Sequence, residues 1–71
     1  MKTSTEMAQI IYSNMKAGQL SNDAMLNECS EQIGYYTEVS IKTDHYPMTL
    51  YAVMQVAIFK ELEIIIQENI D

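Results

Sequence analysis

The segment from Thr49 to Ile70 is the longest part of the chain without glycine or proline, and it carries a dense apolar load. Because strands usually stop near about five or six residues, this length predicts one long helix. At about 100° per residue, its apolar side chains fall on one broad face. They are Tyr51, Met54, Ile58, Phe59, Leu62, Ile65, Ile66 and Ile70.

The first half of this predicted helix is apolar on nearly every side. Between Leu50 and Phe59 the only strongly polar residue is Gln55. A helix of this kind needs cover from the rest of the chain or from a second chain. It is too short to span a membrane, because charged residues from Lys60 onward interrupt the apolar run before about 20 residues are reached.

Local signals predict a first helix over residues 4 to 17. Thr3 and Glu6 have the spacing of a capping box, in which each side chain accepts a hydrogen bond from the other residue's backbone N–H. Apolar residues then recur at three- and four-residue steps from Met7 to Met15. Gly18 is expected to end this helix with a positive φ.

A second helix is predicted over residues 22 to 33. Ser21 can cap it, and Asp23 lies in its first turn, where the helix dipole favours an acid. Gly34 is expected to end this helix in the same way as Gly18 ends the first. Two helices joined by a short turn predict a helical hairpin.

Residues 35 to 48 follow a different pattern, since apolar and polar side chains alternate from Tyr35 to Lys42. Alternation is typical of a short half-buried strand, but the chain offers no second strand to pair with it. We therefore favour an irregular connector over a strand that pairs with its copy across a dimer axis. Pro47 suits the first turn of the long helix, which is thus expected to begin at Pro47, Met48 or after Thr49.

The expected fold is all-α: a single domain, with a short helical hairpin packed on a long C-terminal helix. A chain of 71 residues buries only about 60% of its unfolded surface. A single cysteine and no Cys/His cluster leave oligomerisation as the remaining stabiliser. We expect a homodimer that completes a small helical bundle. Its predicted interface consists of Val53, Met54, Ile58, Leu62 and Ile65. Glu68 and Asp71 at the helix C-terminus favour an antiparallel pair.

No constellation of residues indicates catalysis, a cofactor or a metal. His45 beside Asp44 has no second histidine at ligand spacing, and Cys29 lies in an apolar stripe far from the only histidine. We expect a protein that is not an enzyme, with no cofactor-binding or metal-binding residues. The N-terminal residues show no secretion signal, so a cytoplasmic location is expected.

Four tyrosines indicate either a recognition surface or cover for the ends of the helical core. Tyr35, Tyr36, Tyr46 and Tyr51 lie close together in the sequence, and tyrosine is enriched at interfaces. We therefore expect a non-catalytic protein-interaction module, an adaptor or inhibitor that binds another protein. The net charge of −6 disfavours direct nucleic-acid binding. An alternative is a nucleic-acid mimic whose acids inhibit a DNA-binding protein.

Overall fold

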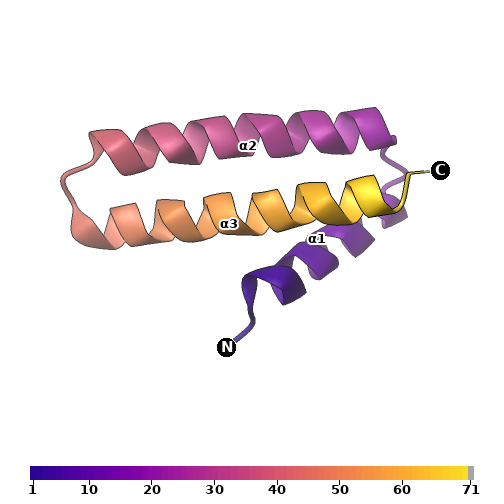
Figure 1. Ribbon diagram of the computed structural model, residues 1–71, viewed down its shortest axis with the longest axis horizontal. Coiled ribbons are helices and arrows are strands. Elements are labelled where there is room, and N and C mark those ends of the chain that lie inside the picture. Colours follow the sequence, from indigo (N-terminus) through magenta and orange to yellow (C-terminus); the bar gives the residue numbers. More distant parts are fainter. Residues whose placement is uncertain (71) are drawn as a thin grey trace.

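A computed structural model describes residues 1–70 and contains three helices (Figure 1). They are α1 (Ser4–Ala17), α2 (Asn22–Lys42) and α3 (Tyr46–Glu68). No strand occurs in this range, so the all-α prediction is confirmed. Asp71, one of the two acids on which the predicted antiparallel dimer depends, lies outside the described residues. None of the three helices is long and apolar enough to cross a membrane.

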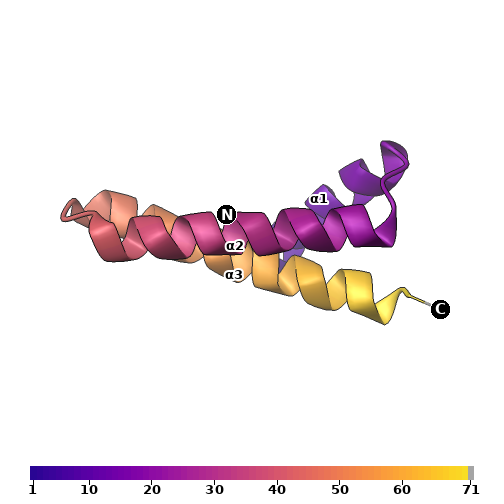
Figure 2. The ribbon, with the colours of Figure 1, turned by 90° about the horizontal axis from the view of Figure 1, so that it is seen from above.

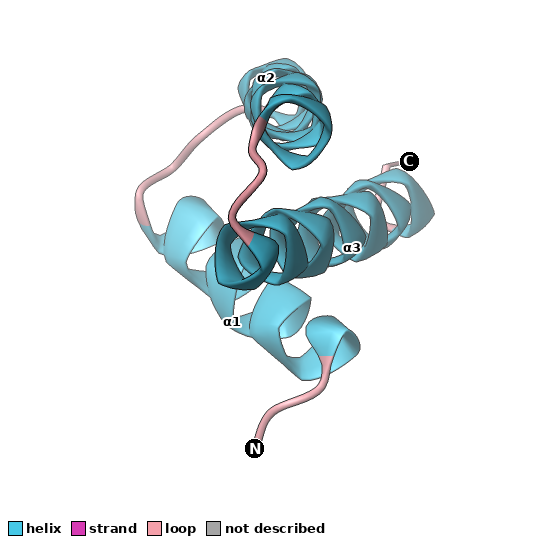
Figure 3. Cartoon of the chain, turned by 90° about the vertical axis from the view of Figure 1, so that its left-hand side faces the viewer, coloured by secondary structure: helices cyan, strands magenta, loops and turns pink. Residues whose placement is uncertain are grey.

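Helix α3 is the centre of the fold. Helix α2 runs antiparallel beside it, and α1 crosses its C-terminal half (Figure 1). In the end-on view α3 lies between α2 and α1 (Figure 3). Helices α1 and α2 both pack on α3 and make little contact with each other. The hairpin predicted from the first two helices is therefore wrong, because the true antiparallel hairpin is formed by α2 and α3.

Helix α1 has the predicted bounds and the predicted start. The backbone N–H of Glu6 donates to the Thr3 hydroxyl at 3.1 Å, and the Thr3 N–H donates to the Glu6 carboxylate at 2.9 Å. The capping box is thus confirmed. The hydrogen bond from the Thr3 backbone N–H to the carboxylate, and then interaction with the Thr3 side chain, lower the pKa of Glu6. The hydroxyl of Thr5 donates to the Glu61 carboxylate at 3.5 Å, which places the start of α1 beside α3.

The end of α1 differs from the prediction in one respect. Gly18 caps the helix, but its φ is −80°, and the positive φ of 61° belongs to Gln19. The Leu20 N–H donates to the Met15 carbonyl at 3.1 Å and the Gln19 N–H donates to the Lys16 carbonyl at 2.9 Å. This pair of bonds is a Schellman motif. Its left-handed residue is Gln19, so the positive φ predicted for Gly18 is wrong.

Helix α2 continues for eight residues past Gly34, where the sequence predicts its end. Gly34 is exposed and does not have a positive φ. A glycine inside a helix costs only about 1 kcal/mol, which burial of neighbouring side chains can outweigh. Partly buried residues recur at helical spacing on both sides of Gly34, at Ile33, Tyr36 and Ser40. The alternation in residues 35–42 therefore belongs to a helix, and both the connector and the strand predictions are wrong.

Helix α3 begins at Tyr46, one residue before the proline that the sequence places in its first turn. A turn of three residues, 43 to 45, joins it to α2. Its N-cap residue His45 makes no side-chain capping bond, and the first turn contains no acid. The N-terminus of α3 is therefore left with backbone N–H groups that no charged side chain of its first turn complements.

The core lies where all three helices meet. It contains Ala8, Met25, Cys29, Ile58, Leu62, Ile65 and Ile66, with Met7, Ile11, Tyr12, Met15, Leu26 and Phe59 packed against it. Three residues of the predicted dimer interface, Ile58, Leu62 and Ile65, thus lie in the core of the single chain. Their assignment to an interface between copies is corrected, because α1 and α2 already cover them.

The molecule is extended for its size. Its dimensions are 41 × 26 × 19 Å and its radius of gyration is 12.7 Å, whereas a compact chain of this length has about 11 Å. Its accessible surface is 4995 Å², and a compact monomer of the same mass exposes about 4500 Å². The three helices therefore leave more surface in solvent than a chain of this size normally does.

Candidate functional site

One half of the α2–α3 hairpin is not covered by α1. Viewed from above, α1 lies toward the end where α2 begins, and the loop between α2 and α3 lies at the opposite end (Figure 2). We call this second end, residues 35–54, the distal half. Apolar side chains in it are between 44% and 77% exposed, namely Tyr35, Ile41, Tyr46, Met48, Leu50, Tyr51, Val53 and Met54. Concentrations of exposed apolar side chains are typical of interaction sites.

Three of the four predicted tyrosines lie in contact across the hairpin. The rings of Tyr35 and Tyr36 meet edge to face with centroids 5.0 Å apart, and Tyr36 meets Tyr51 in the same way at 5.8 Å. Such pairs stabilise by about 0.5–1.5 kcal/mol beyond the area they bury. We call these three residues the tyrosine row. It joins aromatic side chains of α2 to one of α3.

Interaction with the Tyr51 side chain, and then burial, raises the pKa of Tyr36 above its ordinary value. The Tyr36 phenol therefore stays protonated at neutral pH, and its ring presents an apolar body with a neutral polar tip.

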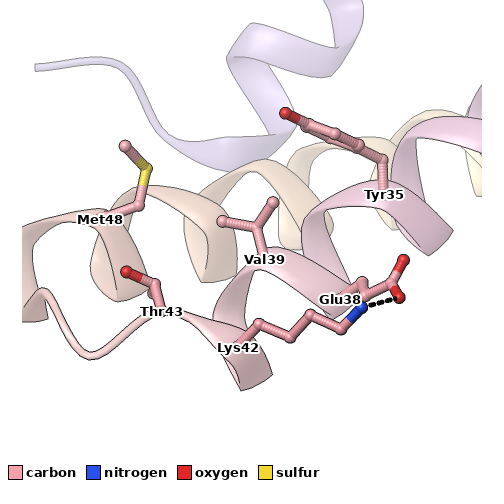
Figure 4. Close-up of a pocket in the computed structure, with 6 residues that line it drawn as sticks. All are labelled: Tyr35, Glu38, Val39, Lys42, Thr43 and Met48. Carbon is pink, nitrogen blue, oxygen red and sulfur yellow. Dashed lines mark hydrogen bonds and ion pairs between the residues drawn. The ribbon is translucent and has the colours of Figure 1, made fainter.

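Beside the tyrosine row is an open groove of about 460 Å³. Tyr35, Glu38, Val39 and Lys42 of α2 line it together with Thr43 and Met48 (Figure 4). Val39 of α2 and Met48 of α3 are its apolar lining residues, and Tyr35 stands at one end (Figure 4). The Lys42 ammonium pairs with the Glu38 carboxylate at 2.6 Å along one rim. Both charged side chains are mostly exposed, so this ion pair contributes little to stability.

The remaining predicted tyrosine, Tyr46, is exposed at the first residue of α3. The structure does not bring it into contact with the tyrosine row. Val39 and Met48, which complete the groove, are absent from the predicted site. Sequence reasoning missed Val39 because it treated residues 35–42 as a connector, and a connector has no defined face.

The distal half of α3 carries no charge. From Tyr46 to Phe59 the helix contains no Asp, Glu, Lys or Arg, and its charged residues begin at Lys60. The acids of the chain therefore lie outside this part of α3. Contacts made here depend on apolar burial and shape more than on charge.

Cys29 and His45, the two residues with potential reactivity, do not line the groove. Cys29 is fully buried in the core. Burial, with smaller contributions from Glu63 and Glu28, raises the pKa of its thiol to about 11. His45 is exposed at the start of α3. Within residues 1–70, no three His, Cys, Asp or Glu side chains come together as a metal site would require.

The chain matches no protein-family model, no curated protein and no solved structure. The distal half of the hairpin is therefore the feature from which a function can be inferred.

Proposed function

We propose that this protein is a non-catalytic interaction module whose groove beside the tyrosine row binds another protein. The observation that carries the proposal is the open groove beside the tyrosine row, where the lining side chains Tyr35 and Met48 are exposed. Tyrosine at the centre of such a surface provides a large contact area and little loss of side-chain entropy on binding. An adaptor or inhibitor that acts in the cytoplasm is the role proposed for it.

The chemistry of the surface favours a protein partner. Small-molecule sites are enclosed and bury most of the ligand, whereas this groove is open along the hairpin. Nucleic acid is disfavoured because the net charge is −6 and the only cation that lines the groove, Lys42, is paired with Glu38. An apolar side chain from a partner would fit between Val39 and Met48.

Helix α1 shows how a partner segment could lie on this hairpin. Its apolar side chains at Met7, Ile11 and Met15 pack against the core, to which the C-terminal half of α3 contributes. These residues follow the four-residue spacing of one helix face. A partner helix with the same spacing could dock on the distal half in an equivalent way, as amphipathic helices do in apolar grooves.

A photo-crosslinking residue placed at position 35 tests the proposal in the cells that encode the protein. The matched control carries the same residue at Gln9, which is exposed on α1 outside the distal half. We expect one protein to crosslink at position 35 and not at position 9. The purified pair should then bind saturably, and Tyr35→Ala should weaken binding by 2 kcal/mol or more, roughly 30-fold.

Salt dependence separates this function from the alternative of a nucleic-acid mimic. Affinity for an apolar groove should change little between about 50 mM and 500 mM salt, whereas a mimic that presents acids loses affinity steeply. A partner that binds equally well to Tyr35→Ala, or whose affinity collapses in salt, would contradict the proposed surface.

A further inference from the structure

A second apolar surface runs along the side of α3 that faces neither α1 nor α2. Tyr46, Leu50, Val53, Ala57 and Ile64 are all exposed. They follow one another at steps of four, three, four and seven residues. Lys60 divides the last step, between Ala57 and Ile64, into steps of three and four. We call these five residues the outer stripe. Alternating steps of three and four are the spacing by which one helix packs along another.

We propose that the outer stripe binds the same stripe of a second copy of this chain, with the two α3 helices antiparallel. This inference goes beyond the proposed function, because it uses a different side of α3 from the groove that contains Met48. It also replaces the predicted interface, of which Val53 alone belongs to the stripe.

The size of the exposed surface supports a second copy. The chain exposes 4995 Å², about 500 Å² more than a compact monomer of its mass. Leu50, Val53 and Ile64 are 50–53% exposed. Together with Tyr46, Ala57 and the flanking side chains, they form a strip about 27 Å long at a rise of 1.5 Å per residue. Burial of this strip against a second copy would remove apolar surface that the chain alone leaves in solvent.

Residue pairing favours the antiparallel orientation. With Ala57 at the twofold axis, Leu50 lies opposite Ile64 of the second copy, and Tyr46 lies opposite Glu68. Ala57 is small, so the two helices can approach closely where they cross the axis. A parallel pair would instead place Lys60 beside Lys60 and Glu68 beside Glu68.

Charge at the helix ends favours the same orientation. Glu68 lies in the last turn of α3, where the dipole disfavours an acid, and that turn contains no base. The first turn of α3 contains no acid, and its N-cap residue makes no side-chain hydrogen bond. In the antiparallel pair, Glu68 of each copy approaches the positive N-terminal end of the other α3.

Sedimentation equilibrium of the wild-type protein, Val53→Asp and Asn27→Asp tests the interface. Both variants add one negative charge at an exposed residue, but Asn27 lies on α2, away from the stripe. We expect wild type and Asn27→Asp to be dimers at micromolar concentration, about twice the chain mass of 8.1 kDa. Val53→Asp should raise the dimer dissociation constant by about 100-fold or more while circular dichroism stays helical. A monomeric wild type, or a Val53→Asp dimer as tight as wild type, overturns the proposal.

Cysteine crosslinking tests the orientation, in protein in which Cys29 has been replaced by alanine. In the antiparallel pair the two Leu50 positions are about 21 Å apart along the helix, beyond the limit of about 7 Å for a disulfide. We therefore expect no disulfide from Leu50→Cys alone, and a disulfide when Leu50→Cys is mixed with Ile64→Cys. Rapid self-crosslinking of Leu50→Cys overturns the antiparallel pair. Tyr35→Ala should leave dimerisation unchanged, so failure of the groove and failure of the stripe are distinguishable.

Discussion

Met54 and Ile58 lie one turn apart on the same side of α3, yet Met54 is 54% exposed and Ile58 only 5%. The difference arises because α1 packs beside Ile58 and Glu61 and does not cover the preceding turn. One continuous apolar stripe is therefore core at its C-terminal end and surface at its N-terminal end. This boundary divides the stabilising residues of α3 from those available to a partner.

Alanine substitutions on the two sides of this boundary should have different costs. Ile58→Ala removes buried methyl groups and should lower the free energy of unfolding by about 2–4 kcal/mol. Met54→Ala changes an exposed side chain and should stay within about 0.5 kcal/mol. Urea denaturation at low protein concentration measures both values. Equal costs would show that α1 does not separate the two positions.

Replacing Gly34 by alanine should stabilise the protein by about 1 kcal/mol. Gly34 is inside α2 without a positive φ, and a Cβ atom built on it meets nothing within 4 Å. Alanine therefore adds helix propensity without a clash. Thermal unfolding followed by circular dichroism should show a higher midpoint for Gly34→Ala. A lower midpoint would indicate that the helix ends at Gly34 after all.

Gln19 is a position at which glycine is expected to stabilise the folded protein. Its φ of 61° is strained for a residue with a side chain. Gln19→Gly should raise the free energy of unfolding by up to about 1 kcal/mol, since glycine is the preferred residue at this place in a Schellman motif. Gln9→Gly, inside α1, is the matched control and should destabilise by a similar amount. If both substitutions destabilise, the left-handed conformation of Gln19 is absent in solution.

The Cys29 thiol should make stability fall at high pH. In the unfolded chain it ionises near pH 8.5, whereas in the folded chain burial raises its pKa to about 11. Between these values the folded state retains the proton and the unfolded state releases it. The stabilisation is therefore complete below the unfolded pKa and is lost as pH rises through the folded pKa.

Cys29→Ala isolates this contribution from those of the tyrosines. The variant should lose about 1 kcal/mol at neutral pH, because it leaves a small cavity. Its stability should then fall less than that of wild type between about pH 8 and about pH 10.5. Urea denaturation across this range measures the difference. Parallel curves, or rapid thiol labelling of the native protein at neutral pH, would contradict a buried, protonated Cys29.

Part of the candidate site could be predicted from sequence. Clustering along the chain identified Tyr35, Tyr36 and Tyr51, which the fold brings into contact. The groove could not be predicted, since Val39 and Met48 line one groove only when α2 continues past Gly34. Judged from local sequence, Gly34 can either end a helix or be tolerated inside one. Packing of α2 on α3 favours the second.

The sequence by itself determined where α1 and α2 begin, the bounds of α1, and the excess of apolar surface on α3. The helix starts depend on hydrogen bonds that span a few residues, such as those of Thr3 with Glu6 and of Ser21 with Ala24. Only the tertiary structure decided which helices pair and which α3 residues are covered. The reason is that burial is set by segments distant in sequence: α1 shields Ile58 and leaves Met54 exposed, although the two share one helix face.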